Sequence, residues 1–74
     1  MPELPRLSGK EAIRVFERLG FHPVRQRGSH VVLRRGDKGC TIPMHNSLAI
    51  GTLRGALRQA GVVPDLFVAA HRNA

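Results

Sequence analysis

The chain has 74 residues, which is enough for one small domain and excludes a TIM barrel, a Rossmann-type cofactor domain and a large multidomain enzyme. Twelve Lys and Arg residues against five Asp and Glu residues leave a formal net charge of +7, which favours a polyanionic partner, with nucleic acid ahead of an anionic membrane. Hydrophobic residues make up 42% of the chain, so we expect a folded core rather than a disordered basic tail.

The start of the chain has no apolar segment of the kind found in a signal peptide, and no apolar stretch is long enough to cross a bilayer. A soluble cytoplasmic protein with no membrane association is therefore expected. The single cysteine, Cys40, excludes an internal disulfide framework and a Cys-rich zinc site. Because so small a domain is only marginally stable alone, a stabilising partner and a weak homo-oligomer both stay open at this stage.

A helix is predicted over residues 9–19. Ser8 and Glu11 have the spacing of a capping box, in which each side chain accepts a hydrogen bond from the backbone N–H of the other residue. Gly20 stands where a helix-ending glycine is expected. The apolar residues between these signals have the spacing of one helix face, and they are Ala12, Val15, Phe16 and Leu19.

Three short extended segments follow, at residues 21–26, 29–34 and 40–44, with turns at 28–29 and 35–39. Proline cannot donate a hydrogen bond to a strand ladder, so Pro23 and Pro43 favour edge positions for the first and third segments. We therefore predict a three-stranded antiparallel meander in which the second segment is the central strand.

Alternation along these strands predicts two different faces. The residues predicted to face inward, under the helices, are Val24, Val31, Leu33 and Ile42. The opposite face is predicted to be open and mostly basic, and it carries Arg25, Arg27, His30, Val32 and Arg34. The expected sheet is therefore covered by helices on one face and presents a positively charged surface on the other.

A second helix is predicted to begin at Gly51 or Thr52 and to end at Gly61. Its apolar stripe has the same spacing as the first and consists of Leu53, Ala56, Leu57 and Ala60. Arg54 and Arg58 lie four residues apart on a neighbouring face of this helix.

Pro64 suits the first position of a short final helix over residues 64–70, which would bury Leu66 and Phe67. The prediction for the whole chain, residues 1–74, is a single α+β domain. Its architecture is a two-layer α-β-β-β-α sandwich with a short extra helix at the C-terminus.

The remaining chemistry-bearing residues do not suggest a metal or a cofactor. Among the four histidines, His22, His30, His45 and His71, no pair has the i, i+4 helical spacing typical of a metal site. Cys40 has no neighbouring base and is interpreted as a small buried apolar residue. Ser29 and His30 are adjacent in a predicted strand, so their side chains point to opposite faces and cannot pair as nucleophile and base.

His30 opens the central strand on the predicted basic face, directly after Gly28 and Ser29. Histidine as a residue type titrates near neutral pH, so it can accept or donate a proton under physiological conditions. Neighbouring arginines can hold phosphate oxygens and stabilise charge that develops on phosphorus. This combination suits metal-independent RNA cleavage, in which the 2′-OH attacks the adjacent phosphorus; DNA, which lacks that hydroxyl, would be inert.

The chain resembles the HicA family of toxin endoribonucleases. The similarity is carried by residues 4–11 (LPRLSGKE), 19–21 (LGF), 25–30 (RQRGSH), 42–45 (IPMH) and 51–61 (GTLRGALRQAG), and it covers about residues 4–67. The resemblance implies a sandwich like that of a double-stranded-RNA-binding domain. It also implies mRNA cleavage that inhibits translation, and a HicB-type antitoxin that blocks the active site. Residues 46–50 contain no lysine, whereas relatives commonly carry basic residues there.

By this resemblance His30 takes the place of the catalytic histidine, and Gly28 and Ser29 form its flanking turn. His45 matches a histidine that follows the third strand, and it is interpreted as a second acid/base or a phosphate contact. The residues interpreted as RNA or phosphate contacts are Arg25, Arg27, Gly28, Ser29, Arg34, Arg54 and Arg58.

Three hypotheses follow from the sequence. The first is a metal-independent endoribonuclease toxin that acts on mRNA and is neutralised by an antitoxin. The second is a non-catalytic RNA-binding module of the same fold. The third is a chain whose main role is to bind its antitoxin through the edge strands and the face that carries Val32.

Overall fold

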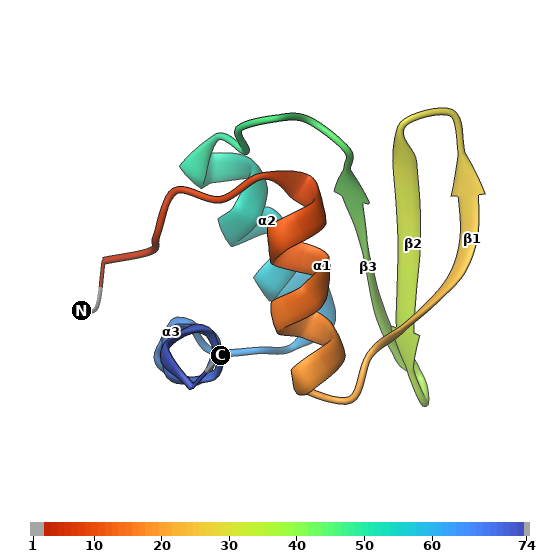
Figure 1. Ribbon diagram of the computed structural model, residues 1–74. Coiled ribbons are helices and arrows are strands. Elements are labelled where there is room, and N and C mark those ends of the chain that lie inside the picture. Colours follow the sequence, from red (N-terminus) through yellow and green to blue (C-terminus); the bar gives the residue numbers. More distant parts are fainter. Residues whose placement is uncertain (1–2, 74) are drawn as a thin grey trace.

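The computed structural model of the chain describes residues 3–73, and a helix, three strands and two further helices follow one another along it (Figure 1). Their bounds are α1 Gly9–Arg18, β1 His22–Arg27, β2 His30–Arg35, β3 Lys38–Pro43, α2 Ile50–Ala60 and α3 Pro64–Arg72. The predicted α+β class and element order are confirmed, and they are consistent with the implied likeness to a double-stranded-RNA-binding domain. The predicted domain of 1–74 also includes Met1, Pro2 and Ala74, which lie outside the described residues.

Helix α1 begins at the predicted capping box. The Ser8 hydroxyl accepts a hydrogen bond from the Glu11 N–H at 3.0 Å, and the Glu11 carboxylate accepts one from the Ser8 N–H at 2.9 Å. The hydrogen bond from the Ser8 backbone, and then that with its side chain, hold the pKa of Glu11 below its usual value. The helix ends at Arg18, with Leu19 as its C-cap, and Gly20 follows in the left-handed region at φ +94°.

The strands form one antiparallel sheet in the order β1-β2-β3, so the second strand is central, as the two prolines predicted. Each hairpin has a two-residue turn, made by Gly28 and Ser29 or by Gly36 and Asp37. Both turn glycines have positive φ values, 54° and 60°, which such tight turns favour. The second turn is shorter than the predicted loop over residues 35–39, because β2 continues to Arg35 and β3 begins at Lys38.

The inner face of the sheet is buried and consists of Val31, Leu33, Cys40 and Ile42. The prediction that Val24 joins this face is wrong, since its side chain is 57% exposed. The register of β1 against β2 shifts between Pro23 and Arg25, and Val24 falls at this irregularity. Every residue of β1 is exposed, and β1 is the strand farthest from the helices (Figure 1).

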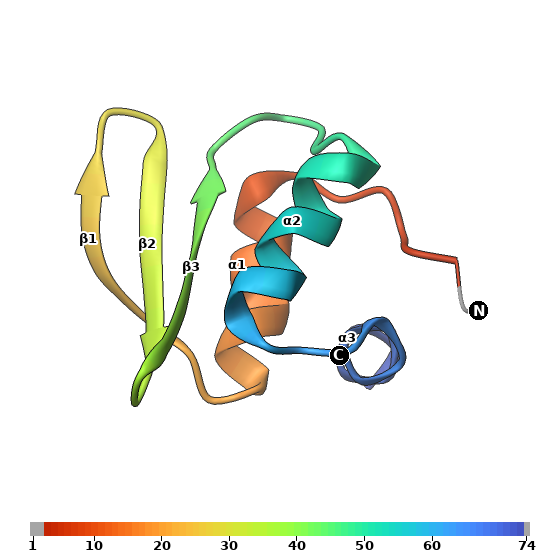
Figure 2. The same cartoon turned by 180° about the vertical axis from the view of Figure 1, so that it is seen from behind.

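Helices α1 and α2 both contact β3, and α3 lies beyond them, on the side away from the sheet (Figure 1 and Figure 2). The predicted apolar stripe of α2 is buried and consists of Leu53, Ala56, Leu57 and Ala60. The helix begins at Ile50 rather than at Gly51 or Thr52, and its N-cap residue, Ala49, makes no side-chain hydrogen bond. Because Ile50 packs against the core, this apolar contact extends the helix by one residue.

Helix α3 is held by a cluster of the three phenylalanines. The Phe67 ring lies 5.3 Å from the Phe16 ring, which lies 5.4 Å from the Phe21 ring, measured between ring centroids. The helix ends at Arg72 rather than at residue 70. The predicted burial of Leu66 is wrong: Leu66 is 47% exposed, because neighbouring residues lie about 100° apart around a helix and Phe67 occupies the buried side.

Candidate active site

His30 is the first residue of β2 and its side chain is exposed on the outer face of the sheet, opposite to the buried inner face. Its cross-strand neighbours are Arg27 on β1 and Pro43 on β3. The turn before it contains Gly28, where an added Cβ would meet nothing within 4 Å. The space beside His30 is therefore open on the side of this turn, so that a polymeric substrate can approach it.

His45 lies in the segment between β3 and α2, and two of the backbone hydrogen bonds that hold this segment lie close to it. The Met44 N–H donates to the Ser29 carbonyl at 2.6 Å, which ties the segment to the turn before His30. The Gly9 N–H donates to the His45 carbonyl at 2.9 Å, which ties the same segment to the start of α1. The fold therefore brings together two histidines that are fifteen positions apart in the sequence.

The two histidines line one groove, here called the histidine groove, between the outer face of the sheet and α2. Its volume is about 420 Å³ and its lining residues are His30, Thr41, Pro43, His45, Gly51, Thr52, Gly55, Ala56 and Gln59. Gly51 and Gly55 lie one helical turn apart, and an added Cβ at either would meet nothing within 4 Å. The absence of side chains at these two positions keeps the helix wall of the groove open.

The histidine groove continues along the outer face into an adjoining hollow of about 330 Å³. Thr41 of β3 and Gln59 of α2 line both spaces, which are therefore contiguous. The lining of the adjoining hollow consists of Val32, Arg34, Asp37, Gly39, Cys40, Thr41 and Gln59. Together the two spaces form a track that runs from the histidines toward the turn at Gly36.

Three of the predicted phosphate contacts share the outer face with His30. Arg27 lies directly opposite His30 and Arg25 opposite Val32, so their Cβ atoms are about 5 Å apart in each pair. Arg34 is four residues along β2 from His30 and lines the adjoining hollow. Arg35 has a different role, since its guanidinium donates to the Leu19 carbonyl at 2.6 Å and lies 4.8 Å from the centre of the Phe21 ring.

Comparison with protein-family models identifies the chain. The model described as the HicA toxin of bacterial toxin–antitoxin systems matches residues 9–62 of the 74. The chain belongs to the HicA toxin family. It is therefore a toxin of a toxin–antitoxin system, and its membership implies an antitoxin partner. No curated protein matches the chain.

The matched stretch of this HicA-family toxin contains every residue that lines the histidine groove and the adjoining hollow. Helix α3 lies outside the matched stretch. The part of the chain that carries the two histidines is thus the part that defines the family.

Two of the predicted phosphate contacts, Arg54 and Arg58, lie away from the histidines. Neither arginine is among the residues that line the histidine groove. Both arginines line a different groove, at the C-terminal end of α2 and the start of α3. The structure does not bring them together with His30.

The sequence prediction did not include Thr41, Thr52 or Gln59 among the site residues, although all three line the histidine groove. The spacing of Gly51, Gly55 and Gln59 was a usable signal, because it marks one helix face that lacks large apolar side chains. That spacing does not reveal which strand lies opposite this helix face. Only the packing of α2 along β3 shows that the outer face of the sheet forms the other wall.

Within residues 3–73, no three His, Cys, Asp or Glu side chains are grouped closely enough to hold a metal ion. His22 is exposed on β1, and His71 lies on α3 beside Glu11 in a separate hollow. Over the same residues, no helix combines the length and the apolar composition needed to cross a membrane.

Cys40 is 5% exposed, as expected for a small buried apolar residue, and burial raises the pKa of its thiol from 9.0 to about 11. In the unfolded chain the thiolate forms at lower pH than in the folded chain. We therefore expect the free energy of unfolding to fall as the pH rises from about 9 to 11, by on the order of 2 kcal/mol at about pH 10.5.

Urea denaturation at several pH values measures this loss. The toxin has no tyrosine, and its lysines, Lys10 and Lys38, are both exposed, so few other groups contribute in this range. Cys40→Ala is expected to be less stable at neutral pH but to lose little further stability between pH 9 and 11. An equally steep decline in Cys40→Ala would contradict the role given to the thiol.

Proposed function

We propose that this HicA-family toxin is a metal-independent endoribonuclease that cleaves mRNA through the 2′-OH and thereby inhibits translation. The observation that carries the proposal is that His30 and His45 line one open groove next to arginine side chains on the outer face. Two residues that exchange protons, together with fixed positive charge, are the groups that cleavage of an RNA phosphodiester requires.

In the proposed reaction His30 acts as the general base and removes the proton of the 2′-OH. The 2′ oxygen forms a bond to the adjacent phosphorus, and the bond between phosphorus and the 5′ oxygen of the next nucleotide breaks. Protonated His45 donates a proton to that leaving oxygen. The products are a 2′,3′-cyclic phosphate and a 5′-hydroxyl, so atoms and charge balance without any cofactor.

The arginines of the outer face stabilise the reacting phosphate. Arg27 is the nearest in register to His30, and its guanidinium can donate two parallel hydrogen bonds to phosphate oxygens. Arg25 and Arg34 extend the positive charge along the track and hold the neighbouring phosphates of the same strand. Gly28 and Ser29 let the RNA backbone approach His30 closely, because the turn is open on that side.

We further propose that an antitoxin of the HicB type neutralises the toxin by covering the histidine groove. Membership in the HicA family supports an antitoxin partner. The groove is exposed on the surface of a strongly basic protein, so a partner with an acidic surface would be attracted to it. The proposed place of action is the cytoplasm, where translated mRNA is present.

The proposal is tested by incubating the purified toxin with RNA in excess chelator and analysing the ends of the fragments. Fragments with 2′,3′-cyclic phosphate ends are the expected result. The same RNA with 2′-O-methyl groups is expected to stay intact, because it has no nucleophile. A mobility shift without cleavage would contradict the proposal and would favour the non-catalytic RNA-binding module.

The proton-donor role of His45 predicts a dependence on the leaving group. His45→Ala is expected to cleave RNA about 10²-fold more slowly than the parent, which is the low end of the range for loss of a positioned acid or base. It is expected to cleave uridine 3′-(4-nitrophenyl) phosphate at nearly the parental rate, because 4-nitrophenolate leaves without a proton. An equal loss of rate on both substrates would contradict the donor role and would make His45 a phosphate contact.

A further inference from the structure

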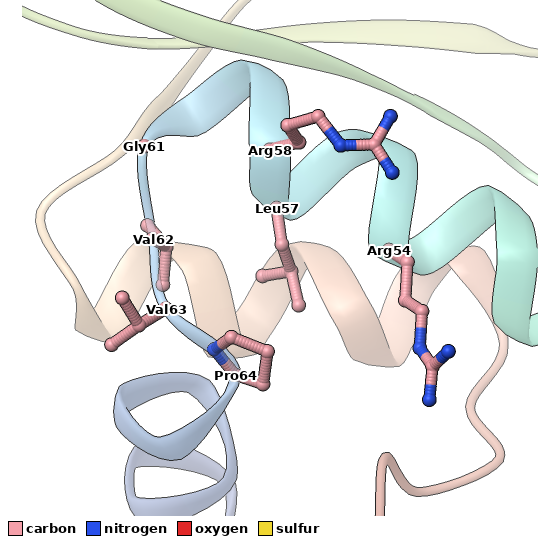
Figure 3. Close-up of a pocket in the computed structure, with 7 residues that line it drawn as sticks. All are labelled: Arg54, Leu57, Arg58, Gly61, Val62, Val63 and Pro64. Atoms are coloured by element: carbon pink, nitrogen blue, oxygen red, sulfur yellow. The ribbon is translucent and has the colours of Figure 1, made fainter. Parts of the chain in front are cut away.

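A second groove lies on the other side of α2, where this helix meets the start of α3 (Figure 3). Its volume is about 450 Å³, and we call it the arginine groove after two of its lining residues, Arg54 and Arg58, whose side chains extend from α2. The other side chains that line it are aliphatic, and they are Leu57, Val62, Val63 and Pro64. The groove thus combines an apolar lining with two positive charges at its edge.

The apolar surface at this groove is unusually exposed for this protein. Among residues 3–73, the exposed large apolar side chains are Val24, Met44, Val63 and Leu66. Val63 is 61% exposed and lines the arginine groove, and Leu66 lies one helical turn further on, in α3. Exposed apolar side chains that adjoin a groove, rather than being scattered singly, mark a surface that binds a partner.

The guanidinium groups of Arg54 and Arg58 donate no hydrogen bond to another described residue, so they can donate to a ligand. Among the described residues, the guanidinium groups that donate hydrogen bonds to the protein are those of Arg18 and Arg35. Arg54 and Arg58 are exposed and lie one helical turn apart, so they can hold two carboxylates of an extended or helical segment at the same time.

We propose that the arginine groove binds a segment of a partner protein in which aliphatic side chains alternate with carboxylates. The aliphatic side chains would pack on Leu57, Val62 and Val63, and the carboxylates would pair with Arg54 and Arg58. The groove lies on a different side of α2 from the histidine groove, so such a partner can bind while RNA occupies the outer face. Two of the lining residues, Val63 and Pro64, lie beyond the stretch that matches the family model.

RNA fits this groove less well than a protein segment does. Proteins that bind single-stranded RNA stack its bases on aromatic rings or on arginine guanidinium planes, and this groove has no aromatic residue and a mostly aliphatic lining. A second copy of the chain fits poorly as well. The formal net charge of +7 makes two copies repel each other, and a symmetric contact here would bring the arginines of both copies together.

The proposal does not depend on the ribonuclease activity, and a peptide tests it directly. The probe is a short fluorescein-labelled peptide of alternating Leu and Glu, and its controls replace Glu by Lys or Leu by Ser. Binding is measured by fluorescence anisotropy at about 0.15 M salt, where long-range attraction between exposed charges is largely screened. Amide chemical shifts of the ¹⁵N-labelled toxin locate the bound peptide.

The Leu/Glu peptide is expected to bind the parent protein and to shift amides between residues 54 and 66, whereas both control peptides bind more weakly. Arg54→Glu combined with Arg58→Glu is expected to weaken binding about ten-fold, and Val63→Asp by a similar factor. The matched control is Arg6→Glu combined with Arg14→Glu, which reverses two exposed arginines outside the groove and is expected to bind as the parent does.

Four results would overturn the proposal. One is a failure of the Leu/Glu peptide to bind, and another is an equal loss of affinity in the Arg6 and Arg14 control. A third is that the Arg54 and Arg58 variant loses affinity for a labelled RNA strand but not for the peptide. The fourth is that the parent protein sediments as a dimer and the Arg54 and Arg58 variant as a monomer, because the occupant of the groove would then be a second copy.

Discussion

His30→Ala is expected to lower the rate of RNA cleavage by about 10²- to 10⁴-fold, the usual cost of removing a positioned general acid or base. The loss is expected to appear in kcat rather than in KM, because the imidazole takes part in proton transfer while the arginines hold the substrate. The side chain is exposed, so the free energy of unfolding should change by less than about 0.5 kcal/mol. Induction of this variant in cells is expected to leave growth and mRNA intact.

The matched control for this experiment is His22→Ala. His22 is an exposed histidine on the same sheet, but it lies opposite Arg34, about 13 Å along β2 from His30, and it lines neither the histidine groove nor the adjoining hollow. The His22→Ala protein should cleave RNA at the parental rate. A folded His30→Ala protein that cleaves as fast as the parent, or an equal loss in His22→Ala, would remove His30 from the mechanism.

Gly9→Ala is expected to lower the free energy of unfolding by about 3 kcal/mol, at the upper end of what overpacking usually costs. Gly9 is buried at the start of α1, and an added Cβ would overlap the Pro43 carbonyl oxygen and lie 3.0 Å from the Met44 Cα. Both are backbone atoms, which cannot move aside by changing a rotamer. The clash therefore outweighs the gain of about 1 kcal/mol that alanine normally brings to a helix in place of glycine.

The same substitution is expected to reduce RNA cleavage, because the displaced backbone is the one that positions His45. The Gly9 N–H donates to the His45 carbonyl, and the Met44 N–H donates to the Ser29 carbonyl beside His30. In a domain this small, a loss of 3 kcal/mol is a large fraction of the total stability. Cleavage should therefore be compared at a low temperature at which circular dichroism shows both proteins to be folded.

Gly51→Ala is the matched control for stability. Gly51 is in the first turn of α2, and an added Cβ there would meet nothing within 4 Å. Urea denaturation should show stability unchanged or raised by up to about 1 kcal/mol, as the helix propensity of alanine predicts. A loss of stability as large as that of Gly9→Ala would contradict the clash at Pro43, and so would a Gly9→Ala protein as stable as the parent.

The sequence predicted the elements whose signals are local. The capping box at Ser8, the apolar stripe after it and Gly20 place α1 to within one residue at its end. Pro23 and Pro43 predicted the strand order, because a residue without an N–H is tolerated only at an edge. The predictions about Val24 and Leu66 were wrong because burial depends on what packs against the side chain. A register shift in β1 decided the exposure of Val24, and the packing of the neighbouring Phe67 ring decided that of Leu66.

The residues of the candidate site also differ in whether local signals in the sequence could predict them. The exposure of His30 on one face with Arg25, Arg27 and Arg34 follows from alternation along paired strands, and the structure has that arrangement. Thr41 and Gln59 were not predicted, since their proximity depends on α2 lying along β3. The sequence placed Arg54 and Arg58 on the second helix as further phosphate contacts, and only the structure shows that they line a groove without His30.

The length of 74 residues and the charge of +7 by themselves predicted one small basic domain. Residue periodicity predicted the helices and the face that carries His30, and the two prolines predicted the central strand. Such properties depend on neighbours close in the chain or on directly paired strands. Only the tertiary structure decided that the basic residues divide between two grooves on different sides of α2. The physical reason is that the histidine groove has one wall from the sheet and one from α2, and the packing of the core sets the distance between these two walls.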